Sequence, residues 1–112
     1  MFTAFLPAMS GEALKDKGRT VRRWRLHLRT TSDIGELAVW MNPVVRGWMN
    51  YYGRFYRTEM YVLLRRINTY LVRWARRKFK RLRAFKRAKR WWNGLLRRQP
   101  ELFAHWAWMP EF

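Results

Sequence analysis

The sequence predicts an all-α fold: a small bundle of about four to five helices with one long basic helix. Apolar residues recur at spacings of three and four, period-two alternation is missing, and helix-start signals precede the periodic stretches. Hydrophobic residues make up 49% of the chain and aromatic residues 18%, which is enough to bury a small core. We expect residues 1–112 to form a single domain, because this length suits one core.

The first 28 residues predict a lead-in followed by one helix. Residues 1–9 are apolar and contain Pro7, which breaks a helix, so we expect an extended segment that packs on the core. Ser10 is a good N-cap. An amphipathic helix of about five turns should follow and reach Leu28, weakened modestly by Gly18.

Two shorter helices are predicted next. Asp33 and Glu36 resemble a capping box, which begins the first of them. Pro43 should stop this helix and begin the second, with Asn42 as its N-cap. The second helix should run to about Tyr56.

Gly47 and Gly53 are unusual within this second helix, because glycine costs about 1 kcal/mol relative to alanine in a helix interior. We expect them to mark places where another backbone, of protein or nucleic acid, comes close. The alternative for Gly53 is that the helix ends near it.

The longest helix is predicted from Thr58–Glu59 to about Ala84. At 100° per residue its two sides separate, and Lys78 falls on the apolar side, where its stem would be buried and its amine would reach out. The apolar side carries Leu64, Ile67, Leu71, Trp74, Ala75 and Leu82, and the basic side carries Arg66, Arg73, Arg77, Lys80 and Arg81. At about 1.5 Å per residue, this basic row extends for more than roughly 20 Å along the helix.

The C-terminal part predicts a last helix that begins at Trp91 and ends near Pro100. Because Trp91 and Trp92 are adjacent on a helix, only one of them can face the core fully, which leaves the other for a nucleic acid base. The aromatic tail from Leu102 to Trp108 should fold back onto the core or onto a partner.

Charge is the strongest functional signal. The chain has 25 basic residues, most of them arginine, against 7 acidic ones, for a formal net charge of +18. Between residues 54 and 98 there are seventeen basic residues, and Glu59 is the only acid. Such an excess repels itself and favours an anionic partner, and arginine pairs with phosphate and stacks on bases. This predicts binding to structured RNA or DNA rather than to a lipid surface.

The sequence gives little basis for catalysis. It has no cysteine, its acidic residues are spread out and mostly explained by helix starts, and no glycine-rich phosphate loop is present. His27 and His105 lack ligand-like spacing, so we expect them to have surface or core roles. We therefore expect no enzyme activity, no metal, no cofactor, no small-molecule substrate and no membrane span, and a cytoplasmic location.

The stretch Asn42–Tyr52 resembles the signature N-P-x-[hydrophobic]-R-G-W-x-N-Y-Y of the group II intron maturase domain, which is domain X or the thumb of group II intron reverse transcriptases. Supporting similarities lie at Phe5–Ser10, Glu36–Ala38, Leu71–Lys78 and Leu102–Trp106. The Tyr-Ala-Asp-Asp polymerase motif of the family's palm is missing, and so are the histidines and cysteines of its endonuclease domain. The chain thus resembles a stand-alone or truncated maturase domain.

The resemblance implies a non-catalytic module that binds intron RNA and assists its folding and splicing. Two alternatives remain: a truncated thumb fragment that docks on a reverse transcriptase palm domain or is an inactive remnant, and a basic peptide at a membrane surface. Trp48 and part of the Tyr51–Tyr52 pair should be packed. The residues expected to contact RNA are Arg46, Asn50, Tyr52, Arg54, Arg66, Arg73, Arg76, Arg77, Lys80, Arg81, Arg87, Arg90 and Trp92.

Overall fold

The computed structural model describes residues 11–108, apart from the side chains of residues 11, 12, 14 and 54–56. Its elements, in chain order, are α1 (Gly11–Trp24), η2 (Leu26–Leu28), α2 (Ile34–Lys78), η3 (Lys80–Leu82), α3 (Phe85–Arg98) and η4 (Ala104–Ala107), where η marks a 3₁₀ helix. No strand occurs in this part of the chain, and the predicted all-α fold is confirmed.

Helix α1 ends at Trp24, one turn earlier than the sequence predicted. Arg25 adopts a left-handed conformation with φ 51° and ψ 46°, which turns the backbone out of the α-helix and into η2. Its peptide nitrogen still donates to the carbonyl of Arg22 at 3.1 Å. The predicted N-cap Ser10 and the lead-in of residues 1–9 lie outside the described residues.

Helix α2 begins after the predicted N-cap Asp33, but it continues past Pro43, where the sequence predicted that the helix would end. Asp33 Oδ1 accepts a hydrogen bond from the Glu36 nitrogen at 2.8 Å, and Glu36 Oε1 accepts one from the Asp33 nitrogen at 2.9 Å, so the capping box is confirmed. Pro43, however, lies inside α2 and does not end it. Proline removes one helical hydrogen bond, and the cost is offset here by the burial of Met41 and Val45 on either side.

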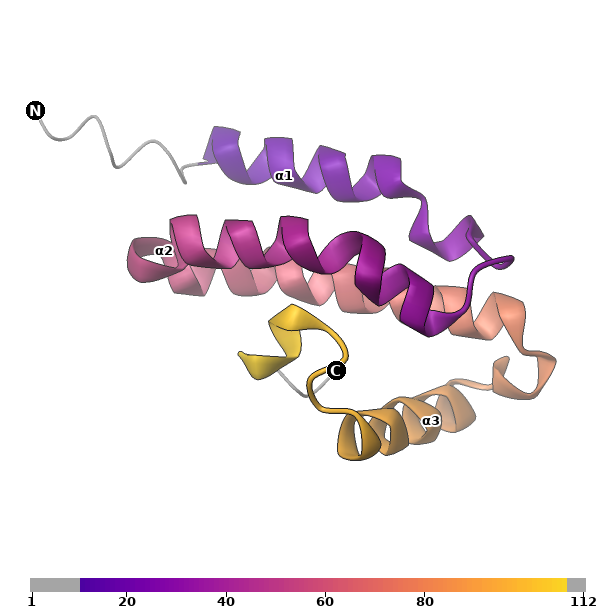
Figure 1. Ribbon diagram of the computed structural model, residues 1–112. Helices are drawn as coiled ribbons and strands as arrows, with labels where there is room; N and C mark the ends of the chain where they lie inside the picture. The colour runs from indigo at the N-terminus through magenta and orange to yellow at the C-terminus, as the bar shows by residue number, and fades with distance from the viewer. Residues whose placement is uncertain (1–10, 109–112) are drawn as a thin grey trace, which may run out of the picture.

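Helix α2 also doubles back on itself near its middle, so that its two halves lie side by side (Figure 1). A straight helix of 45 residues would be about 68 Å long at 1.5 Å per residue, whereas the longest dimension of the molecule is 54 Å. Lys78 Nζ, at the end of α2, donates to the carbonyls of Thr30 and Ser32, just before its start, at 2.9 and 2.8 Å. The three helices predicted between residues 33 and 78 are therefore parts of one helical run that changes direction near its middle.

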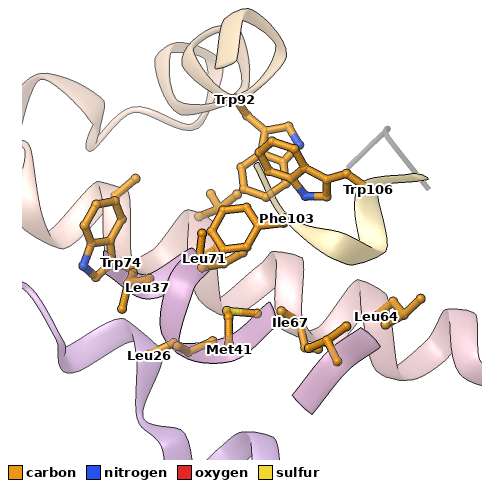
Figure 2. Close-up of a cluster of buried hydrophobic side chains, with 14 of the residues drawn as sticks. Leu26, Leu37, Met41, Leu64, Ile67, Leu71, Trp74, Trp92, Phe103 and Trp106 are labelled. Atoms are coloured by element: carbon orange, nitrogen blue, oxygen red, sulfur yellow. The ribbon is translucent and has the colours of Figure 1, made fainter. Parts of the chain in front are cut away.

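The core lies between the two halves of α2 and the elements that cover them. α1 lies on one side of α2 and α3 on the other (Figure 1). The apolar residues predicted for one side of the long helix are all buried, from Leu64 to Leu82. Figure 2 shows Trp92 of α3 and two C-terminal aromatic residues, Phe103 and Trp106, meeting above Leu71 of α2. The predicted basic side of that helix is exposed, so the two-sided pattern is confirmed.

The C-terminal segment folds back onto α2, as predicted. Phe103 and Trp106 are buried, and their ring centroids lie 5.0 Å apart. Asn42, predicted as an N-cap, plays a different role, because its Nδ2 donates to the Leu102 carbonyl and its Oδ1 accepts from the Ala104 nitrogen, both at 2.9 Å. One amide side chain thus holds the backbone of a segment about sixty residues further along the chain.

His105 is a core residue and is held by Asn68. Trp106 Nε1 can only donate, and it lies 3.2 Å from Asn68 Oδ1, which fixes the orientation of that amide. The same oxygen lies 2.6 Å from His105 Nε2, so this nitrogen carries a hydrogen and donates it. Burial lowers the pKa of His105 from 6.5 to about 3.

We expect acid to destabilise the fold through His105. Between pH 6.5 and about pH 3 the unfolded chain binds a proton that the folded chain does not. The contribution of neutral His105 to the free energy of unfolding is therefore complete above pH 6.5 and is lost as the pH falls toward 3. This corresponds to a loss of about 2 kcal/mol between pH 7 and pH 5. Guanidinium unfolding followed by tryptophan fluorescence at the two pH values measures it. H105Q should remove most of the difference, whatever its own stability, whereas an unchanged difference in H105Q contradicts the assignment.

Candidate nucleic-acid interface

The positive charges of this protein are largely uncompensated. Among the described residues the only ion pair joins Lys17 Nζ to Asp16 Oδ2, at 3.8 Å, and it lies on α1. The remaining lysine and arginine side chains of that part of the chain have no carboxylate within ion-pair distance. Repulsion among them costs folding free energy, and an anionic ligand would relieve this cost.

The second half of α2 carries the predicted row of arginines, but not as one open surface. Arg66, Arg73 and Arg77 are all exposed and share the helix side that carries Tyr70. A side chain at Gly18 of α1 would collide with the guanidinium group of Arg66, so Arg66 crosses α1 at that glycine. Arg73 and Arg77 lie further along, where η2 replaces α1.

A basic depression, which we call the His27 groove, opens at this end of the molecule. It is lined by His27, Arg73, Arg76, Arg77 and Arg83, which come from η2, from the last turns of α2 and from the end of η3. An adjoining hollow is lined by Thr30 together with three of the same arginines. No acidic residue lines either of them, so the groove can accept an anion without displacing a carboxylate.

Hydrogen bonds from side chains to backbone hold the groove together. Both Nε and a terminal nitrogen of Arg76 donate to the carbonyl of Arg83, at 3.0 and 2.6 Å, which ties η3 to α2. Trp74 Nε1 donates to the Arg29 carbonyl at 2.7 Å and ties the segment after η2 to α2. Arg76, predicted to contact RNA, therefore uses two of its donors inside the protein, while Arg73 and Arg77 keep theirs.

Burial and the positive charges of the groove both change the pKa of His27. Its pKa is lowered, first by burial and then by the charges of Arg77, Arg73 and Arg25. Its ring stacks on Tyr70, with centroids 5.4 Å apart and planes at 26°. Neither His27 nor Arg83 was predicted for this site, because nothing local in the sequence indicates that residues 27, 73 and 83 meet.

A second basic surface, which we call the α3 flank, follows the groove along the chain. It consists of Lys86, Lys89, Arg90, Asn93 and Arg97, which line a shallow depression along α3. Their spacing of three, four, seven and eleven residues from the first places them on one flank of the helix. Of these residues only Arg90 was predicted, although the spacing could have identified the others. Arg87 is also exposed, but it does not line this depression.

The residues of the Asn42–Tyr52 stretch lie elsewhere, on the first half of α2. Arg46 and Asn50 are exposed and one turn apart. Tyr52 is half-buried beneath Lys17, whose Nζ lies 5.2 Å from the ring centroid, whereas Tyr51 is 74% exposed. The side chain of Arg54 is not among the described ones. Lys80 and Arg81 are exposed on η3, so the predicted contacts do not form one site.

The prediction that Trp92 contacts a base does not fit the structure. Trp92 is completely buried, and its ring centroid lies 5.1 Å from that of Trp106. Its neighbour Trp91 is the partly exposed member of the pair. Adjacent residues point about 100° apart on a helix, and the side on which α3 packs decides which of them is buried.

The two glycines behave differently from each other. A side chain at Gly53 would collide with the ring of Trp108, so another part of the protein does come close there, although it is a side chain rather than a backbone. Apart from Gly47 itself, its chain neighbours and the backbone of its own helical turns, no described atom lies within 4 Å of the place where a side chain at Gly47 would begin. The expected close approach at Gly47 therefore does not involve the described part of the chain.

Residues 11–108 contain neither a membrane-spanning helix nor a group of metal ligands. No helix there is long and apolar enough to cross a bilayer. Within the same residues, no group of three or more histidine or acidic side chains is arranged to hold a metal ion.

Comparison with known proteins identifies the family. No curated protein and no solved structure gives a significant match. A family model described as "Group II intron, maturase-specific domain" matches residues 14–92, well over half of the chain. The match includes the Asn42–Tyr52 stretch, α2 and the His27 groove, and it ends within α3. The chain belongs to the group II intron maturase-specific domain family.

Proposed function

We propose that this protein is a non-catalytic RNA-binding domain that binds group II intron RNA and assists its folding and splicing. Family membership links the domain to intron splicing. The observation that supports RNA binding most directly is the uncompensated charge, because the described residues contain one ion pair in a chain of net charge +18. We further propose that residues 1–112 act as one unit, in which the His27 groove and the α3 flank contact phosphates.

Salt dependence of RNA binding tests this function. A protein that makes about six to ten phosphate contacts loses roughly 10³- to 10⁵-fold in affinity between about 50 and 200 mM salt, because counterions are released on binding. We expect a loss of this size in filter-binding titrations with a folded group II intron RNA. Comparison with an unrelated structured RNA of equal length measures selectivity. Affinity that is independent of salt contradicts the proposal.

The alternative of a fragment that docks on a polymerase subunit relied on the aromatic ends of the chain, of which the structure describes the C-terminal one up to residue 108. In the structure Phe103 and Trp106 pack within the molecule, so their apolar surface needs no partner protein. The exposed large apolar residues lie elsewhere, and Val39 and Tyr51 are the most exposed of them. Size-exclusion chromatography with light scattering separates the two functions, because we expect a folded monomer without a polymerase subunit.

A further inference from the structure

The His27 groove contains a group that phosphate contact alone does not require. Arginines supply charge, but the imidazole of His27 lies among them, held by its stacking on Tyr70. Its Nδ1 is buried and has no hydrogen-bond partner among the described residues. A ligand in the groove cannot reach this buried atom. It would meet the ring at Nε2, which is not among the buried atoms and makes no hydrogen bond within the described residues, so Nε2 is the ring nitrogen that can bond to a ligand.

We propose that the His27 groove is a specific site for a phosphodiester group of the bound RNA, in which Arg73 and Arg77 pair with the phosphate oxygens and His27 donates a hydrogen bond and takes up a proton as the RNA binds. This proposal rests on the proposed function, since it names the group that the site holds and a regulation of its occupancy.

The charges around His27 couple proton uptake by its imidazole to the binding of a phosphate. Among the described residues, the charged groups that act on His27 are cations: Arg25 from the turn before η2, and Arg73 and Arg77 from α2. Tyr70 contributes its ring, which stacks on the imidazole. The other two residues that line the groove are arginines as well. Burial first, and then these cations, lower the pKa of His27 below 6.5, so the free imidazole is neutral at neutral pH. A phosphate bound between Arg73 and Arg77 cancels part of their field and brings a negative charge next to the ring. Binding must then favour the imidazolium form, and by linkage acid must favour binding.

The groove is also suited to a strand with many phosphates rather than to a single acidic side chain. Arg83 lies only three residues before Lys86, so the groove is followed directly along the chain by the α3 flank. The bonds of Arg76 and Trp74 to backbone carbonyls fix the walls before any ligand arrives, which lowers the ordering cost of binding. A polyanion can occupy both surfaces, whereas one carboxylate can occupy only one.

Nuclear magnetic resonance of the two histidines tests the proposal on the full chain. H27Q assigns the His27 imidazole signal by removing it. We expect saturating intron RNA to raise the pKa of His27 by about one unit, which corresponds to about tenfold tighter binding of the protonated form. Wild-type protein should bind RNA several-fold more tightly at pH 6 than at pH 7.5, and H27Q, which keeps a donor, should lose this difference. H27A should weaken binding up to about tenfold at pH 6.

Three results would overturn the proposed phosphate site, and they differ in what they say about the proposed function. RNA that binds with an unchanged pKa of His27 and unchanged affinity for H27A overturns the site and leaves the proposed function intact. A polyglutamate peptide that raises this pKa as much as RNA does assigns the groove to an acidic protein and overturns it as well. Failure of any RNA to bind overturns both the proposed function and the site.

Discussion

Reversing the charge of Arg73 and Arg77 together should weaken RNA binding by about two orders of magnitude at moderate salt and reduce the slope of log affinity against log salt by about 1.4 to 1.8, because two phosphate contacts are lost. Both side chains are exposed, both line the His27 groove, and neither is tied to the protein backbone as Arg76 is. Filter binding of R73E/R77E across a salt series measures both quantities.

The matched control is R19E/R23E, which changes the net charge by the same amount. Arg19 and Arg23 are exposed on α1 and line neither the groove nor the depression along α3. We expect this variant to lose much less affinity than R73E/R77E. Equal losses would mean that RNA responds to the overall charge of the protein, and an unchanged slope in R73E/R77E would remove these two residues from the interface. Circular dichroism should show that both variants stay helical.

Replacing Trp106 by alanine should have the largest effect on stability. Its side chain is 2% exposed, packs against Trp92 and Phe103, and donates to Asn68. Truncation of a buried tryptophan costs about 3–5 kcal/mol, because contacts are lost and a cavity remains. This is a large part of the roughly 5–15 kcal/mol that stabilises a typical domain. We expect a decrease in Tm of at least about 10 °C, measured by thermal unfolding.

Trp40 provides the comparison for this prediction. Its side chain is 44% exposed, and the guanidinium carbon of Arg29 lies 4.5 Å from its ring centroid. W40A removes the same number of atoms from a surface position, so it should cost about 1 kcal/mol or less. If W106A unfolds no more easily than W40A, the C-terminal segment does not contribute to the core as described.

Local signals in the sequence predicted the local structure well. The capping box at Asp33 and Glu36 formed because both partners lie within one helical turn. The apolar side of the long helix was identified because periodicity reports which residues face a core. Pro43 was misjudged for the opposite reason, since a local preference to end a helix was overridden by packing on both sides of it.

The site was predicted only in part, because its residues meet through the fold. Arg73 and Arg77 followed from the helical row, whereas His27 and Arg83 join them only after η2 and η3 have packed against α2. The choice between Trp91 and Trp92 depended on the rotation of α3, which adjacent apolar residues do not determine. The sequence predicted Asn42 as the N-cap of the helix that follows it, whereas its hydrogen-bond partners lie about sixty residues away.

The bonds that Asn42 and Asn68 make with residues 102–106 have a consequence for synthesis on the ribosome. During translation the two halves of α2 can emerge and pair while the segment that closes over them is still inside the exit tunnel. Leu71 of α2 then stays uncovered until Phe103 and Trp106 reach it. The nascent domain therefore exposes an apolar surface beside its arginines until residue 106 is released, and such a surface is prone to aggregation.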